Sequence, residues 1–467
     1  MANLQKVAQQ LTQRAVNTAS EPFSSKRLPL PKIGEWLSPF CKLAVANTFS
    51  NLMVPLAGLI DTAFLGHLSD IRYLNGVALA TVIFNVIYWG FNFFRMGTTG
   101  PTAQAVGRND LDEVWLIVFR NLLLALGAGL LVWGLRSPIS TIGFALLETS
   151  PDVRLAAMDF YNGRIIGAPA VLINYALLGW LLGRSKGRQV IMLAVVGNGS
   201  NIGLDYWFIH KLGLESYGAG LATALSQYIM LAMGLALVVS EGIPWDRWGR
   251  IRARLWNPAA LMSLFNLNRD ILVRTFALVI SMSLFTNFSS GLGDTILGVN
   301  ALLMQVVLMS AYFMDGIALA VESYAGNFYG RQAKGDLYGL LLLGIGGSVV
   351  LGGAIALFLI SFPALFFQLL TDHTILLDDI PQYAIWLLPV LCFGGVAFTL
   401  DGYFLGLTDG RSLRNSTLIA ALIGFLPLAL VADQLELPHL LWLALAGLMF
   451  TRTLTLLRKV PFTLVEK

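Results

Sequence analysis

The sequence GWLLGRSKGR at residues 179–188 reappears 223 residues later as GYFLGLTDGR at residues 402–411. The two segments share three glycines and a final arginine at identical spacing. A second pair, AVGR at 105–108 and FYGR at 328–331, aligns at the same offset. Ordered matches at one offset indicate that the chain is an internal duplication, and a duplication of this length constrains the whole fold.

The composition places both copies in a membrane. Hydrophobic residues make up 56% of the chain and charged residues 12%, whereas soluble domains carry about 25% charged residues. The 46 glycines agree with this, because glycine is frequent in membrane helices and lets their backbones approach closely. We therefore expect an all-α polytopic membrane protein, and we interpret the net charge of +4 as loop bias and not as a sign of nucleic-acid binding.

A scan for stretches of about 20 apolar residues predicts the membrane spans. It yields twelve transmembrane helices, at 40–65, 74–97, 114–135, 160–183, 189–209, 217–240, 271–291, 296–320, 338–362, 383–406, 413–433 and 439–457. Each copy holds six spans, so two pseudo-symmetric six-helix lobes of equal orientation are expected, with substrate bound between them. The predicted organisation is an N-terminal tail (1–36), an N-lobe (37–240), a cytoplasmic linker (241–270), a C-lobe (271–459) and a C-terminal tail (460–467).

The distribution of positive charge predicts the orientation of the spans. With a cytoplasmic N-terminus, the inner loops and span ends carry 13 Lys and Arg residues and the outer loops carry four. This fits the positive-inside rule, so both termini are expected in the cytoplasm, with the chain in the inner or plasma membrane. Residues 1–36 lack the apolar core of a cleaved signal peptide. Their Ser, Gln and Arg content leaves a transit peptide open, and the membrane would then be organellar.

Four carboxylates fall inside the predicted spans: Asp61, Asp205, Asp315 and Asp401. An aspartate at the centre of a membrane helix costs about 2.5–3.5 kcal/mol on insertion scales. Such residues are functional candidates by default, and pairing that only holds helices together is the alternative. The repeat aligns Asp61 with Leu284. The acids therefore do not follow from the duplicated scaffold.

The first span has one polar face. Asn47, Asn51 and Asp61 fall on the same side of a helix. Pro55 lacks the N–H that would bond the carbonyl of Asn51, which weakens the helix at that turn. A freed carbonyl is tolerated in a membrane where it lines a cavity or packs on protein. The pattern predicts a cavity wall.

The fifth span offers a partner for Asp61. Asn201 and Asp205 lie four residues apart, on one helix face. Burial and a second carboxylate nearby both favour a bound proton, as a proton-coupling site requires. The arginines look structural by comparison: Arg95 is expected to cap or pair, and Arg164, near a predicted span end, to snorkel to the interface.

These residues resemble the multidrug and toxic compound extrusion (MATE) family, in its DinF-type branch. The resemblance is carried by SNLMVPLAGLIDTAFLGHL (50–68), FRMGTTGPTAQAVGR (94–108), LLGWLLG (177–183), GNGSNIGLDYWF (197–208), LNRDILVR (267–274), MDGIALAVES (314–323) and LDGYFLG (400–406).

The resemblance implies twelve helices around a central cavity and export driven by inward movement of H+ or Na+. It implies coupling at Asp61, with Asn201 and Asp205 as partners and Thr223 on the sixth span. Some branches carry a glutamate in the seventh span, and residues 271–290 have none. This departure favours H+ over Na+.

The sequence thus predicts a proton antiporter that exports drug-like or amphiphilic organic solutes, with organic acids open. The expected coupling residues are Asp61, Asp205 and Asn201, and the expected cavity residues are Asn47, Asn51, Pro55, Thr223, Asp315 and Asp401. We expect a monomer in the lipid bilayer that binds a small-molecule substrate and needs no cofactor or resident metal.

Two transporters of the same broad class stay as alternatives, a Na+-coupled exporter and a lipid-linked oligosaccharide flippase. The flippase would need a large cationic cavity, whereas the mid-span charges look mainly acidic. An enzyme is not expected, because the sequence contains neither HExxH nor GxSxG.

Overall fold

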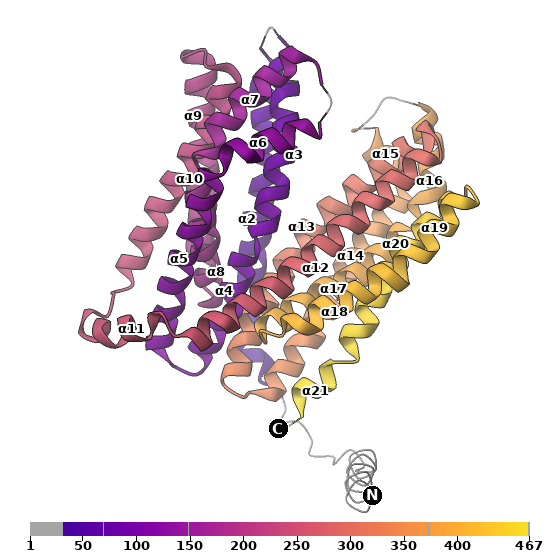
Figure 1. The fold of residues 1–467 in the computed structure, drawn as a ribbon. Coiled ribbons are helices and arrows are strands. Elements are labelled where there is room, and N and C mark those ends of the chain that lie inside the picture. Colours follow the sequence, from indigo (N-terminus) through magenta and orange to yellow (C-terminus); the bar gives the residue numbers. More distant parts are fainter. Residues whose placement is uncertain (1–30, 69, 148, 369, 371–373, 466–467) are drawn as a thin grey trace, which may run out of the picture.

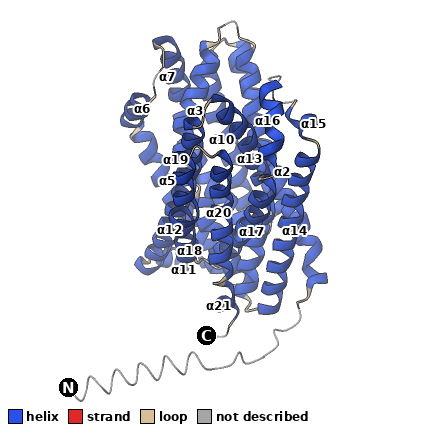
Figure 2. Cartoon of the chain, turned by 90° about the vertical axis from the view of Figure 1, so that its right-hand side faces the viewer, coloured by secondary structure: helices blue, strands red, loops and turns tan. Residues whose placement is uncertain are grey.

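The computed structural model describes residues 31–68, 70–147, 149–368, 370 and 374–465. All of its regular secondary structure in these ranges is helical, and Figure 2 shows the long helices running along one common direction. Most of the predicted N-terminal tail, residues 1–30, lies outside the described residues. The first described helix, α2, begins at Ile33, within the last residues of the predicted tail.

The N-terminal half of the structure runs from Ile33 to Ser240. Its elements are α2 (Ile33–Gly66), α3 (Arg72–Phe91), α4 (Phe93–Gly107), α5 (Leu111–Gly134), α6 (Arg136–Ala145), α7 (Pro151–Ile165), α8 (Ala168–Gly183), α9 (Gly187–Asp205), the π-helical η1 (Tyr206–Lys211) and α10 (Glu215–Ser240).

The C-terminal half follows a short connection that holds η2 (Trp245–Arg247) and α11 (Trp248–Leu255). Its elements are α12 (Pro258–Gly291), α13 (Asp294–Gly330), α14 (Lys334–Ser361), α15 (Pro363–Phe367), α16 (Thr374–Ala384), α17 (Leu387–Gly406), α18 (Gly410–Ile419), η3 (Ala420–Phe425), α19 (Leu426–Gln434), α20 (Pro438–Leu457) and α21 (Val460–Leu464).

The membrane-crossing segments agree with the predicted architecture. Within the described residues, ten helical segments are long and apolar enough to cross a bilayer, and α7 with α8, bent by 52°, makes eleven. The remaining segment is α9, whose Asn198, Asn201 and Asp205 lower its hydropathy. The twelve-helix membrane fold predicted from the sequence is confirmed.

Several elements begin earlier than the hydropathy scan indicates. The segment predicted as a linker at 241–270 contains η2, α11 and the first turns of α12, which already begins at Pro258. Asn257 caps α12, because its Oδ1 accepts the N–H of Ala259 at 3.0 Å. Arg120 of α5 fixes the connection by donating to the carbonyls of Arg254 at 2.9 Å and Leu255 at 3.1 Å.

The two halves diverge at one end and meet at the other (Figure 1). At the closed end α4 packs directly on α13 and α17. Gly100 permits this approach, because a Cβ there would overlap the carbonyl oxygen of Leu405. Gln104 then donates from Nε2 to the carbonyl of Gly406 at 2.9 Å. The beginning of α2 and the short α21 both lie at this closed end.

Candidate functional site

A cavity of about 270 Å³ lies among the helices of the N-terminal half. Helices α2, α3, α4, α7, α8, α9 and α10 supply nearly all of its lining, and Leu319 of α13 closes one side. The polar groups that face it include Asn47, Asn51, Arg95, Arg164, Asn174 and Thr223. A concave site with a few convergent polar groups is the usual form of a small-molecule binding site.

Three of the predicted cavity residues line this cavity: Asn47, Asn51 and Thr223. Asn47 is 1% exposed, and neither its Oδ1 nor its Nδ2 has a hydrogen-bond partner. A buried polar group left unpaired costs about 1–3 kcal/mol. Asn174 has the same character on α8, since its Nδ2 donates to the carbonyl of Gln227 at 2.9 Å while its Oδ1 is unpaired. These amides are suited to binding a polar group inside the cavity.

The predicted coupling residues come together beside the cavity, where α2 packs on α9. Asn201 donates from Nδ2 to Oδ2 of Asp205 at 2.8 Å, and Asp205 is 0% exposed. The carboxyl group of Asp61 interacts electrostatically with that of Asp205. The Oδ1 atoms of both aspartates are buried and have no hydrogen-bond partner in the described structure. Two carboxyl groups that act on each other in this way favour a shared proton, because both cannot easily be ionised together.

The backbone changes its winding at this pair. Asp205 is the last residue of α9, and the chain continues as the π-helix η1 from Tyr206 to Lys211. Short π-helical insertions are frequent at functional sites. Helix α2, in contrast, stays continuous through Pro55, which does not line the cavity.

Arg164 connects the aspartate pair to the cavity. Its guanidinium lines the cavity and interacts electrostatically with Asp61. The guanidinium carbon lies 4.6 Å from the ring centre of Phe84, 5.5 Å from that of Phe160 and 5.8 Å from that of Tyr88. Arg164 forms no ion pair within 4.0 Å among the described residues. The contacts of its guanidinium are therefore cation–π contacts with these rings.

The prediction that Arg164 snorkels is wrong. The hydropathy scan began the fourth span at residue 160, near Arg164, because α7 carries several charged residues. The span instead starts at Pro151 and breaks between Ile165 and Ala168. Arg164 therefore sits at an interior break and not at a span end.

The charge of the cavity also differs from the expectation. Two arginines, Arg95 and Arg164, line it, and no carboxylate does. Asp61 and Asp205 do not line the cavity. The expectation of mainly acidic mid-span charges fails because a scan for apolar residues does not place an arginine that lies at the break of a span.

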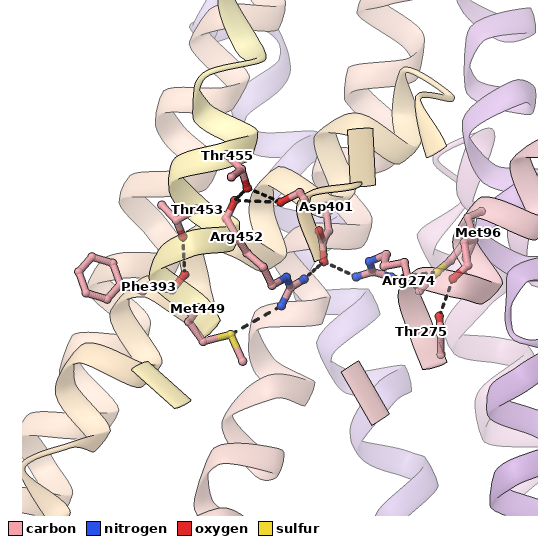
Figure 3. Close-up of polar contacts among 11 residues, drawn as sticks. Met96, Arg274, Thr275, Phe393, Asp401, Met449, Arg452, Thr453 and Thr455 are labelled. Atoms are coloured by element: carbon pink, nitrogen blue, oxygen red, sulfur yellow. Dashed lines mark hydrogen bonds and ion pairs between the residues drawn. The ribbon is translucent and has the colours of Figure 1, made fainter. Parts of the chain in front are cut away.

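Asp401 and Asp315 do not line this cavity. Asp401 of α17 is bound by Arg274 of α12 and Arg452 of α20 (Figure 3). All three are buried, with exposures of 3%, 5% and 0%. Asp315 of α13 is half-buried and interacts electrostatically with Arg274 and with Arg95.

This arginine–aspartate cluster also reaches the N-terminal half. The Nη1 of Arg274 lies 3.9 Å from Sδ of Met96, and the Nη1 of Arg452 lies 3.6 Å from Sδ of Met449 (Figure 3). Sequence reasoning missed Arg452, which is separated from Asp401 by 51 positions and meets it only through the packing of α17 on α20. The position of Arg452 deep inside an apolar span was the one sign in the sequence that it has a buried partner.

Comparison with known proteins gives consistent results. A family profile described as MatE matches residues 47–207 and 271–430, one match in each copy of the repeat. The chain is 36% identical over 420 residues to the DNA damage-inducible protein F of Escherichia coli (strain K12), covering 89% of this chain and 90% of that protein.

More distant relatives also match over nearly the whole length of the chain. The chain is 23% identical over 443 residues to the probable multidrug resistance protein NorM of Thermotoga maritima, covering 92% of this chain and 93% of that protein. Among solved structures, an outward-facing conformation of a multidrug resistance MATE family transporter superposes with a TM-score of 0.82 at 19% identity. That match covers 92% of this chain and 96% of the other and shows a common fold.

Proposed function

Since this chain belongs to the MATE family of multidrug and toxin extrusion transporters, which are membrane transporters and not enzymes, we propose that it exports organic solutes in exchange for protons. The observation that carries the choice of H+ is the pair of Asp61 and Asp205, with Asn201 bonded to the latter at 2.8 Å. The pair can take up and release a proton without a change in the surrounding side chains, because the amide of Asn201 can bond either protonation state.

The proposed cycle couples the aspartate pair to the cavity through α2. Asn47 and Asn51 of this helix line the cavity, and Asp61 lies further along it. Protonation from outside neutralises the pair, and α2 then bends near Pro55, where one backbone hydrogen bond is missing. The bend moves Asn47 and Asn51, narrows the cavity and releases the solute. Loss of the proton to the cytoplasm resets the cycle.

The arrangement of the halves fits the proton-loading step. If the chain ends lie in the cytoplasm, the closed end formed by α4, α13 and α17 is cytoplasmic and the diverging end faces outward. The proposed location is the inner or plasma membrane, with both termini inside, as a monomer. The lobe boundaries at 37–240 and 271–459 remain predictions, as does an organellar membrane in the event that residues 1–30 are a transit peptide.

A Na+-coupled exporter is the second candidate. The carboxylate and amide oxygens of Asp61, Asp205 and Asn201 are of the type that bind hard cations. In the C-terminal half the carboxylate of Asp401 is already held by two guanidinium groups, which disfavours a cation there. The two arginines of the cavity remove the charge argument against a lipid-linked oligosaccharide flippase. Size still disfavours it, since a cavity of about 270 Å³ is small for such a head group.

The proposal is tested with everted membrane vesicles that hold the full-length chain. Uptake of ethidium and of radiolabelled benzyltrimethylammonium is measured under an acidic lumen and, separately, under a high luminal Na+ concentration. Uptake that needs the pH gradient and disappears in Asp61→Asn supports proton antiport. Uptake that follows the Na+ gradient alone selects the Na+-coupled candidate.

A further inference from the structure

We propose that a second cavity, at the closed end between the two halves, binds a phosphate group carried by a small molecule or a lipid, and that the bound phosphate holds the halves together. This cavity has a volume of about 690 Å³ and shares no lining residue with the cavity of the N-terminal half. Helices α4 and α5 line it from one half, and α12 and residues 408–411 line it from the other. The inference is independent of the coupling ion, because its test measures the binding of phosphate.

The internal repeat shows that the cavity does not follow from the duplicated scaffold. At one of two equivalent positions, the ring centre of Trp36 lies 6.2 Å from that of Phe40 and 6.4 Å from that of Tyr324, so α2 packs on α13 through aromatic rings. The counterparts of these three residues at the offset of 223 residues are smaller, and all of them line the cavity: Ala259, Ser263 and Pro101. Small side chains in place of large ones leave open space where the surroundings do not collapse. The chain therefore fills one of the equivalent positions and leaves the other open.

Two unpaired arginines line this cavity from opposite halves. Arg108 directly follows α4, and Arg411 lies in the first turn of α18. They end the repeated motifs AVGR (105–108) and GYFLGLTDGR (402–411). Both are exposed, and neither guanidinium forms an ion pair or a hydrogen bond among the described residues. Since a guanidinium presents paired N–H donors that match phosphate oxygens, the two groups are suited to bind one phosphate from both sides.

A third arginine adds a buried positive charge. Arg120 of α5 lines the cavity and is 4% exposed. Its Nε and Nη2 donate to the carbonyls of Leu255 and Arg254, while its Nη1 has no acceptor among the residues that the structure describes. Its hydrogen-bond partners are thus neutral groups. Because a buried charge without a charged partner is costly, an anion in the cavity would stabilise Arg120.

The carboxylates that line the cavity already have partners. Asp270 accepts from two arginines of its own half, at 2.7 Å and 3.1 Å, and Glu113 accepts from Arg254 at 2.8 Å. Asp409 caps α18 by accepting the N–H of Ser412 at 3.1 Å. The three lining arginines are therefore left to bind an anion of more than one charge, as a phosphate monoester is. The volume lies in the range of small-molecule sites, so the organic part of the ester also has room.

The position of the cavity predicts what a bound phosphate does. The closed end is where α4 packs on α13 and α17 (Figure 1). Separation of these helices would move Arg108 and Arg120 away from Arg411, and the phosphate would lose contacts on one side. The ligand therefore binds the closed arrangement more tightly than an open one and shifts the population toward it. The cavity is thus a site at which a phosphorylated ligand slows transport.

The first test measures binding of radiolabelled glycerol 3-phosphate to the purified full-length protein by equilibrium dialysis in a phosphate-free buffer. Wild type should bind it, and Arg108→Gln and Arg411→Gln should each bind it at least about tenfold more weakly, because hydrogen bonds between charged groups are lost. The matched controls are Arg331→Gln and Arg188→Gln. These two arginines are exposed and end the same motifs in the other copy, but they do not line the cavity. Both controls should bind the probe as wild type does.

The same variants distinguish a soluble ligand from a lipid. Phosphatidic acid is added to the protein in phosphatidylcholine nanodiscs, and its binding is measured by native mass spectrometry. If phosphatidic acid binds and is lost in Arg108→Gln and Arg411→Gln, the phosphate belongs to a lipid head group. If glycerol 3-phosphate alone shows this pattern, the ligand is soluble. Binding of neither probe, or an equal loss in the two controls, overturns the site.

The second test measures whether the ligand holds the halves together. Ser323 of α13 is buried where this helix meets α8 of the N-terminal half. Ser323→Cys is placed in a chain whose native Cys41 and Cys392 are replaced by serine. With the phosphate probe that binds, at about ten times its Kd, labelling by a membrane-impermeant maleimide should be about tenfold slower. An unchanged labelling rate would overturn the role of the phosphate in closure.

Discussion

Asn201 donates a hydrogen bond of 2.8 Å to Oδ2 of Asp205 and leaves the Oδ1 of that carboxyl group without a donor. Asp61 of α2 interacts electrostatically with Asp205, so the acids of two different spans act on each other. Helix α2, which carries Asp61, also carries the cavity residues Asn47 and Asn51. A change in the charge of the pair therefore acts on the helix that shapes the cavity.

Asn47 should stabilise solute binding at the expense of protein stability. Its two unpaired side-chain atoms lose their hydration on folding. Asn47→Leu is expected to raise the free energy of unfolding by about 1 kcal/mol and to weaken binding of benzyltrimethylammonium several-fold. Asn121→Leu is the control, because Asn121 is equally buried, already donates to the carbonyl of Ile117 and does not line the cavity. Unchanged solute binding in Asn47→Leu would remove this residue from the site.

Substitutions in the buried cluster of Asp401, Arg274 and Arg452 should lower the free energy of unfolding by unequal amounts. Asp401→Asn removes the carboxylate that binds both buried guanidinium groups, and a loss of about 3–5 kcal/mol in the free energy of unfolding is expected. Arg452→Met leaves the pair of Arg274 and Asp401 intact and should cost clearly less. Unfolding in mixed micelles by increasing SDS measures both. Equal losses would contradict this prediction, because the cluster would then depend on Arg452 as much as on Asp401.

Gly100 should be essential for closing the halves. A Cβ at this position meets the carbonyl oxygen of Leu405, whereas a Cβ at Gly127 of α5 meets nothing within 4 Å. Gly100→Ala is expected to fold but to lose transport, and Gly127→Ala to transport normally. Ser323 of α13 is 0% exposed and donates to the carbonyl of Leu182 of α8 across the two halves. In Gly100→Ala, a cysteine introduced at Ser323 should therefore become exposed and react with a membrane-impermeant maleimide. Normal transport by Gly100→Ala would show that this contact is not part of the cycle.

Glu241, just beyond α10, should make stability depend on pH. Its carboxylate accepts from Arg184 at 2.7 Å, Gln189 at 3.0 Å and Lys186 at 3.1 Å. Burial by itself raises the pKa of Glu241, but the hydrogen bonds and the positive charges outweigh it and lower the pKa from 4.5 to about 2.

Because the pKa of Glu241 is depressed on folding, its contribution is complete above pH 4.5 and is lost as the pH falls toward 2. Glu241→Gln is expected to lower the free energy of unfolding by about 1–2 kcal/mol at pH 7, and the difference from wild type should shrink below pH 4.5. Thermal unfolding in detergent between pH 3 and pH 7 measures it. If the free energies of unfolding of Glu241→Gln and wild type differ by the same amount from pH 3 to pH 7, the destabilisation comes from packing and not from the charge of Glu241.

Much of the fold is predictable because hydropathy and duplication are properties of the sequence itself. The meeting of Asp61 with Asn201 and Asp205 is predictable in part, since the spacing of four puts the latter two on one face. The position of Asp61 beside them needs the packing of α2 on α9, which the sequence suggested only as a possible partnership of two buried acids and which the family resemblance implied.

The missed features share a physical cause. Arg164 lies in α7, whose charged residues hid the true start of the span at Pro151. Arg452 meets Asp401 across two helices, and no local pattern encodes such a pair. The early start of α12 at Pro258 was hidden in the same way, by the polar residues of its first turns. A scan for apolar residues fails at polar residues inside spans, and the proposed binding and coupling groups are residues of this kind.

The central claim is that transport is coupled to protons at Asp61. The most direct measurement is benzyltrimethylammonium uptake by everted vesicles at a fixed pH gradient, comparing wild type, Asp61→Asn and, as a control for a half-buried acid in the other half, Asp315→Asn. We predict uptake by wild type and by Asp315→Asn, and none by Asp61→Asn at equal amounts of folded protein. Uptake by Asp61→Asn that still depends on the pH gradient would contradict the account.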